Sequence, residues 1–269
     1  MKKKLMRYLA LTRAGIMEQL QFRLGTVVVL LSNIIYLVII YFLWKAIYAS
    51  SPSDVVNGMT FNDTMIYLVL ASALFSAMEM YVTWFLGRSV QTGKIVLDIL
   101  KPITFEKYYF FLFSGNTVVS SILTLFPTII VVYFVTDSGF ALSYNLLFFL
   151  VAVILGIIIN YYVNFVVGTI CFYTESIWGV NIMKEVIVLL LSGATIPLAF
   201  FPETLKNIAY KLPFQAIYNT PLTLLINNEL GLTEKFMMIL TQVFWVFIMT
   251  IISHLFFKVS IKHITVNGG

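Results

Sequence analysis

Apolar residues are grouped in long runs along this chain, and more polar stretches separate the runs. Six apolar runs, each between 21 and 29 residues long, are separated by more polar stretches. A helix rises 1.5 Å per residue, so about 20 apolar residues cross a hydrocarbon core of roughly 30 Å. The pattern therefore predicts six transmembrane helices, at residues 25–47, 64–86, 108–135, 144–172, 178–198 and 236–257.

The first 23 residues have a different pattern. Apolar residues recur on one side of a helix at Leu5, Leu9, Ile16 and Leu20. The basic residues of this segment are Lys2, Lys3, Lys4, Arg7, Arg13 and Arg23. An apolar stripe beside a basic face is typical of a helix that lies on an anionic lipid surface. We therefore predict an interfacial helix over 1–23; an ordinary basic cytoplasmic tail is the alternative.

A second amphipathic stretch lies between the second and third predicted spans, in the loop 87–107. Its charged residues recur at helical spacing, and apolar residues cover the other sides. The charged positions are Lys94, Asp98 and Lys101, and the apolar positions are Ile95, Val96, Ile99 and Leu100. Gly93 and Pro102 bracket the stretch as helix breakers. We predict a short docking helix; a charged loop packed under its own bundle is the alternative.

The fifth predicted span runs into a segment rich in proline, residues 192–221. Pro197 and Pro202 interrupt the apolar run, and Pro213 and Pro221 follow a short amphipathic piece. A proline inside a helix removes a backbone donor and clashes with the preceding turn. Broken backbone at membrane depth persists only where protein or a water-filled cavity satisfies it. The segment predicts a re-entrant hairpin between the fifth and sixth spans that forms part of a gate or pathway.

The composition agrees with a single transmembrane domain over residues 1–269. The chain is 60% hydrophobic and 11% charged, against roughly 25% charged residues in soluble domains. The net charge of +5 is explained by the lysines and arginines that cytoplasmic loops of membrane proteins collect. The sequence contains no basic run interleaved with aromatic residues, so nucleic-acid binding is not expected. One cysteine, Cys171, and two distant histidines, His254 and His263, predict no metal site.

Basic residues indicate the orientation. With the N-terminus inside, 13 of the 17 lysines and arginines fall in cytoplasmic pieces, and only Lys45, Lys206, Lys211 and Lys235 fall outside. This bias predicts that both termini are cytoplasmic and that residues 192–221 lie on the outer face. Trp44 and Tyr48, near the outer end of the first span, are expected to anchor it at the interface.

Polar residues inside the predicted spans are candidates for function. Glu79 lies about two turns from the inner end of the second span and could pair with Arg88, line a cavity, or reach the inner headgroups. Asn160 and Asn164 lie one turn apart in the fourth span, where hydrogen bonds between helices are expected before substrate contact. At the start of the fifth span, the charged residues are Glu175, Lys184 and Glu185. We expect these three at the cytoplasmic interface.

Residues 87–94 do not form a phosphate-binding loop. Five residues separate Gly87 from Gly93 where the motif needs four, and Ile95 follows Lys94 where it needs Ser or Thr. Paired carboxylates at helical spacing and a Ser/His/Asp arrangement are also missing from the sequence. The chain is therefore not expected to be an enzyme, and we expect it to bind no cofactor.

Four local sequences resemble those of type-2 ABC exporter permeases. They are TGKIVLDILKPI (92–103), FYTESIWG (172–179), SGATIPLAFFPETL (192–205) and LPFQAIYNTP (212–221). Six spans, an amphipathic N-terminal helix and a charged loop after the second span also resemble this family. Compact permeases grouped with daunorubicin- and viologen-type exporters are the most similar branch. The resemblance covers nearly the whole chain.

The resemblance implies an all-α permease of the bacterial cytoplasmic membrane. It implies two permease chains, identical or sister, and two copies of a separate ATPase that binds ATP and Mg²⁺. It implies that 87–107 holds a coupling helix, with Gly93, Lys94, Asp98, Lys101 and Pro102 at the ATPase. It also implies an outer gate formed by Ile196, Pro197, Phe200, Phe201, Pro202, Pro213 and Phe214. The pathway would hold Glu79, Asn160 and Asn164.

The expected function is ATP-driven export of an amphiphilic or hydrophobic substrate, because few charges in the spans could solvate a small ion. A secondary carrier or channel is the first alternative, although it would be expected to place coupling charges in mid-membrane and to show repeated halves. A membrane assembly or immunity factor that transports nothing is another.

Overall fold

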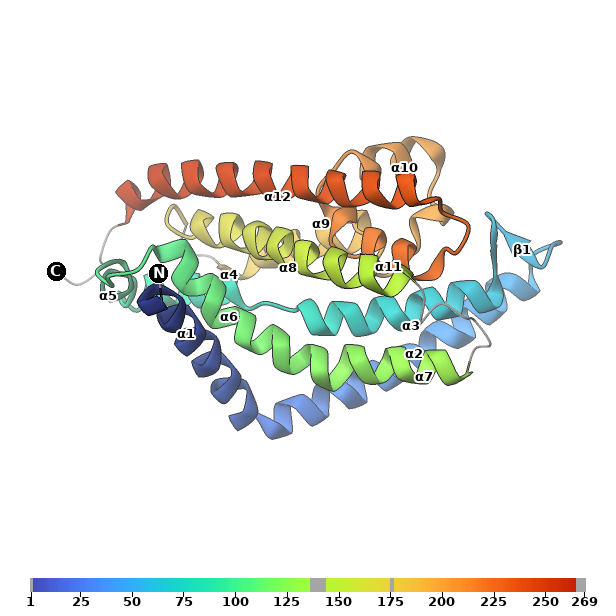
Figure 1. Ribbon diagram of the computed structural model, residues 1–269, viewed down its shortest axis with the longest axis horizontal. Helices are drawn as coiled ribbons and strands as arrows, with labels where there is room; N and C mark the ends of the chain where they lie inside the picture. The colour runs from blue at the N-terminus through green and yellow to red at the C-terminus, as the bar shows by residue number, and fades with distance from the viewer. Residues whose placement is uncertain (1, 136–143, 175–176, 265–269) are drawn as a thin grey trace.

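The computed structural model describes residues 2–135, 144–174 and 177–264. It is an elongated helical bundle (Figure 1). One end, the α5 end, holds the first turns of α1 (Lys2–Gln21), the short helix α5 (Ile95–Ile99) and the last turns of α12 (Leu232–Ser260). The other end, the α10 end, holds α10 (Glu203–Tyr210) and a small β-hairpin.

Five helical segments of the described chain are long and apolar enough to span a membrane. They are Leu24–Ala49, Phe61–Gln91, Phe105–Phe134, Tyr144–Ile170 and Leu232–His263. The corresponding elements are α2 (Arg23–Ala49), α3 (Phe61–Met78) with α4 (Val82–Gln91), α6 (Phe105–Ser120) with α7 (Phe126–Val135), α8 (Tyr144–Ile170) and α12. Five of the six predicted runs are therefore found as span-length helices.

The fifth predicted run, 178–198, forms a shorter helix than expected. Helix α9 (Ile177–Leu191) has 15 residues. At 1.5 Å per residue it is about 22 Å long, which is less than the roughly 30 Å of a hydrocarbon core. The chain turns at Gly193, whose φ of 79° is unfavourable for residues with a Cβ, and no helix follows before Leu198.

The second span is interrupted where the sequence predicts a continuous helix. Helix α3 ends at Met78, Glu79 is extended with ψ of 124°, and α4 begins at Val82. Neither proline nor glycine lies at this break. Because α4 continues to Gln91, Glu79 lies 12 residues before the end of the span and not two turns from it.

The third span contains a wider turn. A π-helical turn, η1 (Ser121–Leu125), joins α6 to α7, whose second residue is Pro127. Proline has no N–H to donate to the carbonyl one turn earlier and its ring collides with that turn, so a widened turn relieves the clash.

The all-α prediction holds apart from one small hairpin after α2. Strands β1 (Val55–Val56) and β2 (Met59–Thr60) pair antiparallel, with Val55 opposite Thr60. The two turn residues, Asn57 and Gly58, both have positive φ, as a two-residue hairpin turn requires.

Helix α3 lies at the centre of the larger core. Its side chains Leu70, Ala71 and Leu74 are fully buried among residues of α7, α8 and α11 (Asn219–Ile226). A second core near the α5 end gathers Tyr109, Tyr161 and other rings from α4, α6 and α8. By contrast, α2 buries only Ile40 and Trp44 of its described side chains, so most of its apolar surface is uncovered.

Helix α1 leans against α6 through small residues (Figure 1). A Cβ on Gly115 would lie 2.4 Å from the Thr12 carbonyl oxygen, so the two backbones touch only because Gly115 has no side chain. The Thr12 hydroxyl donates to the Phe111 carbonyl oxygen at 3.0 Å. Three residues of the predicted apolar stripe of α1, Leu5, Leu9 and Leu20, are exposed, whereas the fourth, Ile16, is partly buried and its backbone lies at this contact.

Candidate functional site

Helix α5 presents an apolar surface at the α5 end. Gly93, with φ of 70°, turns the chain out of α4, and Pro102 follows the helix. Ile95 is buried beneath the helix. Val96, Leu97 and Leu100 project outward, with exposed fractions of 37%, 65% and 74%. We call these three residues the α5 face.

The charged residues of this loop hold it against α6. The Asp98 side chain is buried; its Oδ1 accepts a hydrogen bond from Lys101 Nζ at 2.6 Å and its Oδ2 accepts one from the Tyr109 hydroxyl at 2.7 Å. Burial alone lowers the pKa of Lys101, but its hydrogen bonds with Asp98 and Tyr108 outweigh that effect and raise the pKa above its ordinary value. Asp98 and Lys101 therefore fix the position of α5. Lys94 instead is exposed, 5.5 Å from the Phe85 ring centre.

The proline-rich segment 192–221 forms short elements at and below the α10 end. They are η2 (Leu198–Phe200), α10 and η3 (Phe214–Ala216), followed by α11. Pro197, Pro202 and Pro213 each directly precede one of the first three elements. Pro197 and Pro213 are buried, and Phe201 and Phe214 are partly buried; Ile196 and Pro202 are exposed.

Phe200 connects this segment to the first span. Its ring centre lies 4.6 Å from that of Trp44, which is only 5% exposed. The prediction that Trp44 anchors the span at the lipid interface is therefore wrong, because Phe200 and its neighbours cover it.

The same segment reaches the middle of α8. A Cβ on Gly156 would lie 2.9 Å from the Ile217 carbonyl oxygen. Gln242 of α12 donates to the carbonyl oxygens of Ala152 at 3.0 Å and of Ala216 at 2.7 Å. A side-chain amide thus satisfies irregular backbone between two span-length helices, as such backbone requires away from water.

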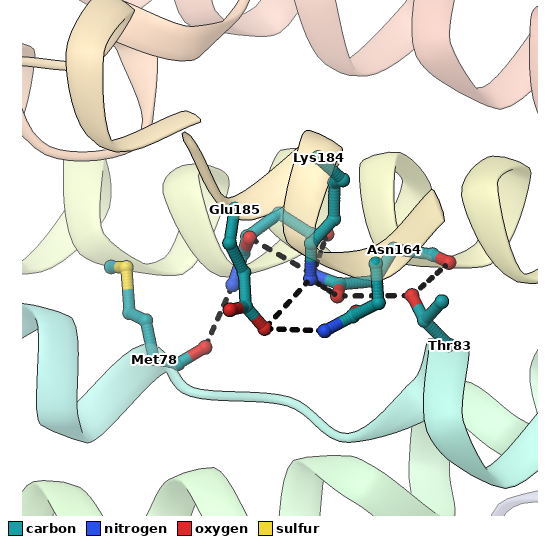
Figure 2. Close-up of polar contacts among 7 residues, drawn as sticks. Met78, Thr83, Asn164, Lys184 and Glu185 are labelled. Carbon is teal, nitrogen blue, oxygen red and sulfur yellow. Dashed lines mark hydrogen bonds and ion pairs between the residues drawn. The ribbon is translucent and has the colours of Figure 1, made fainter. Parts of the chain in front are cut away.

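The break in the second span is held by a side chain of α8. Asn160 Nδ2 donates to the Met78 carbonyl oxygen at 2.7 Å, which is the last helical carbonyl of α3. Figure 2 shows the chain extended between Met78 and Thr83, with α8 and α9 beside it. The Thr83 hydroxyl then donates to the Asn164 carbonyl oxygen at 3.0 Å. The Asn160 amide therefore bonds to another helix, as expected for a buried amide, whereas Asn164 Nδ2 donates to Asn160 within α8.

Lys184 is packed inside the bundle. Its Nζ donates to Asn164 Oδ1 at 2.8 Å, and its side chain is 11% exposed (Figure 2). It lies in the middle of α9 (Ile177–Leu191), and its position at the cytoplasmic interface stays a prediction. Glu185 is half exposed, with Oε1 3.9 Å from Lys184 Nζ, and accepts from Asn181 Nδ2 at 2.5 Å. Glu175 lies outside the described residues.

These side chains line a common cavity of about 230 Å³. Six of the residues that line this cavity are polar or charged and not aromatic. We call them the polar cluster: Glu79, Asn160, Asn164, Asn181, Lys184 and Glu185. Ionisable groups between span-length helices are costly unless paired and commonly mark a pathway. Glu79 lines this cavity, and among the described residues it forms no ion pair with Arg88.

The sequence analysis placed three of these six residues, Glu79, Asn160 and Asn164, on the pathway. It named Lys184 and Glu185 but expected them at the cytoplasmic interface, and it did not single out Asn181. The α3–α4 break had no proline or glycine to reveal it. The amides of Asn160 and Asn164 were the only sequence signal for this break. A buried Asn side chain needs hydrogen-bond partners, and the unpaired carbonyl at the end of a broken helix can be such a partner.

Comparison with protein-family models matches residues 34–268 to the family described as ABC-2 family transporter protein. No curated protein matches the chain. The matched range includes four span-length helices whole and the larger part of the first, Leu24–Ala49. It also includes the α5 loop, the polar cluster and the elements of the α10 end from β1 onward. Because the match covers far more than half of the chain, this protein belongs to the ABC-2 transporter family as a multi-pass membrane permease.

Proposed function

We propose that the chain is the permease subunit of an ATP-driven exporter that moves an amphiphilic or hydrophobic substrate outward across a bacterial cytoplasmic membrane. ABC-2 membership implies partnership with an ABC ATPase. Two permease chains would enclose the pathway, and the largely uncovered face of α2 supports a second chain, identical or sister, beside it.

The observation that carries this proposal is the α5 face. Val96, Leu97 and Leu100 are exposed at an end of the bundle, next to the exposed Lys94. Apolar side chains that project from a loop held rigidly by Asp98 are typical of a docking surface, because exposure to water is unfavourable for them by roughly 25 cal/mol per Å². Two ATPase subunits, each with ATP and Mg²⁺, would each bind one α5.

The proposed mechanism connects α5 to the far end of the bundle. ATP binding closes the ATPases and displaces α5, which follows directly after α4. Helix α4 packs on α8 and α9, and both contact the segment 192–221. We propose that this segment, with Ile196, Phe200, Phe201 and Phe214, re-enters the membrane as the outer gate and opens when α9 moves.

The test replaces two residues of the α5 face. Leu97→Glu with Leu100→Glu is expected to abolish co-purification of the partner ABC ATPase, while the permease still inserts and elutes as a single species. The matched control, Leu205→Glu on the exposed side of α10, should leave co-purification unchanged. Equal recovery of the ATPase with wild-type and double-variant permease contradicts the docking surface.

The polar cluster favours a second candidate, an ion-coupled carrier, because it places charged groups between helices. The two candidates differ in their energy source. Transport in proteoliposomes that needs ATP and the ATPase supports the exporter; transport driven by an ion gradient with the permease alone supports the carrier.

A further inference from the structure

Asn164 of α8 accepts hydrogen bonds from two other helices. The Thr83 hydroxyl of α4 donates to its backbone carbonyl oxygen at 3.0 Å and lies 3.4 Å from its Oδ1. Lys184 Nζ of α9 donates to the same Oδ1 at 2.8 Å (Figure 2). Asn164 Nδ2 donates to Asn160 Oδ1 at 3.1 Å, which orients the amide. An amide oxygen has two lone pairs, so Oδ1 can accept from α4 and α9 together.

These contacts join the helix that carries α5 to the helix that leads into the segment 192–221. Helix α4 leads through the turn at Gly93 into α5, and α9 ends directly before the segment begins. The two helices also meet at the first residue of α9, since a Cβ on Gly87 would lie 2.3 Å from Ile177 Cγ1. Helix α4 is therefore connected to α9 both directly and through Asn164.

Helix α4 can move separately from α3 because the span is interrupted between them. Residues 79–81 lie outside both helices, and Glu79 is extended. A few residues at the end of an element can absorb a change of φ and ψ and so act as a hinge. Helix α3 itself is anchored, since Leu70, Ala71 and Leu74 are fully buried in the larger core. A displacement of α5 is therefore expected to turn α4 and to leave α3 in place.

Lys184 is expected to stay bound to Asn164 when α4 moves. Its side chain is 11% exposed, and Glu185 Oε1 lies 3.9 Å from its Nζ, which is too far for a hydrogen bond. A largely buried ammonium that loses its acceptor is costly. When Thr83 shifts with α4, the Asn164 side chain loses one of the contacts that hold it and can turn. Lys184 then follows the amide oxygen and moves α9.

We propose that Lys184 and Asn164 couple the movement of α4 to that of α9, so that displacement of α5 by the ATPase reaches the outer gate through their hydrogen bond. Residues 79–81 are the hinge about which α4 turns. Lys184 is a positioning residue in this role, because it acts by holding α9 to Asn164. This inference rests on the proposed function and identifies the residues that transmit movement between its two ends.

The test measures how strongly the gate responds to ATP. Full-length permease with Ile196→Cys is reconstituted with the partner ABC ATPase in nanodiscs. The rate of maleimide labelling is compared without nucleotide and in the ATP-trapped state. Permease with Cys171 alone gives the background, since that thiol is buried. With no further substitution, we expect the two rates to differ by about fivefold or more, the lower end of typical coupling between distant sites.

Variants at the two ends of the connection should remove this response. Lys184→Met removes the donor on α9, and Thr83→Val removes the donor on α4 at nearly constant volume. In both variants the two labelling rates should become nearly equal. Lys184→Arg keeps a donor and should restore the response. The matched control is Thr169→Val, which should respond as wild type does, because the buried Thr169 hydroxyl donates to the Val166 carbonyl oxygen within α8.

Two further readouts separate transmission from folding. Each variant should still co-purify with the ATPase, and its labelling rate without nucleotide should match that of wild type. The resting gate has other contacts that hold it, such as the hydrogen bond from the Tyr67 hydroxyl to the Gly193 carbonyl oxygen. A response of wild-type size in Lys184→Met or Thr83→Val overturns the proposal. A changed rate without nucleotide in both variants indicates a merely structural role and also overturns it.

The outcome is separable from that of the proposed function. If wild-type permease recruits the ATPase and its gate responds to ATP, but the variants respond equally, the exporter stands and only the Lys184 connection is wrong. If wild type recruits the ATPase but its gate does not respond, the gate proposed for residues 192–221 fails together with the connection. If no ATPase is recruited, the docking surface fails as well.

Discussion

At the scale of single residues, Asn160 explains how a membrane helix can stop without proline or glycine. Its amide donates to the Met78 carbonyl oxygen, which the end of α3 leaves without a helical partner. A buried carbonyl that lacks a donor costs about 1–3 kcal/mol. One side chain on α8 therefore maintains the conformation that places Glu79 in the cavity lined by the polar cluster.

Asn160→Leu should lower the free energy of unfolding by about 1–3 kcal/mol, because it removes that donor and keeps a similar volume. The midpoint of thermal unfolding in detergent measures the effect. Asn207→Leu, on the exposed face of α10, is the control and should leave the midpoint unchanged. A similar midpoint for wild type and Asn160→Leu would show that another group, such as water, satisfies the carbonyl.

At the scale of elements, the contact between α1 and α6 depends on glycine. Gly115→Leu should separate the two helices, since even its Cβ would collide with the Thr12 carbonyl oxygen at 2.4 Å and with Ile16 N at 2.6 Å. Thr12 and Ser114 offer a direct measurement, because their hydroxyl oxygens lie 3.2 Å apart. Cysteines at these two positions should form a disulfide in otherwise wild-type protein and none with Gly115→Leu.

Gly179→Leu is the matched control for this experiment, because a Cβ at Gly179 would meet no atom within 4 Å. The disulfide should form in that variant as in wild type. Its formation in the Gly115 variant as well would show that α1 is held by contacts other than the close backbone approach.

The sequence predicts elements best where one signal dominates. Apolar length alone located α2, α8 and α12, because each is a continuous run that no tertiary contact interrupts. The breaks depend on partners far along the chain: the α3–α4 break is satisfied from α8, and the turn after α9 is held by Tyr67, whose hydroxyl donates to the Gly193 carbonyl oxygen at 2.9 Å. Local sequence carries no information about such partners.

The candidate site follows the same rule. Glu79, Asn160 and Asn164 were predictable because polar residues are rare in apolar runs and need partners there. The contact of Asn164 with Lys184 was not predictable, because it depends on how the short helix α9 packs against α8. Likewise, spacing predicted a helix near Asp98, but only packing on Tyr109 turns the carboxylate inward and the α5 face outward.

At the scale of the whole molecule, the proposed mechanism needs the α5 face and the segment 192–221 on opposite sides of the membrane. The bundle places α5 and α10 at opposite ends, and α1 and the end of α12 lie with α5 (Figure 1). Single cysteines at Leu97 and Ile196, exposed by 65% and 40%, can report the side that each end faces. The native Cys171 is buried, and burial raises the pKa of its thiol to about 11, so little reactive thiolate is present at neutral pH.

In intact cells, a membrane-impermeant maleimide at neutral pH should label Ile196→Cys and leave Leu97→Cys unlabelled until the membrane is permeabilised. Wild-type protein, with Cys171 alone, should stay unlabelled in both conditions, which makes it the background control. If ATPase closure moves the gate, trapping the ATP-bound state should also change the labelling rate at Ile196→Cys. The control is Asp54→Cys, on the exposed loop before β1 at the same end, and its labelling rate should stay unchanged. Labelling of both positions from one side would contradict the opposite placement on which transmission from α5 to the gate depends.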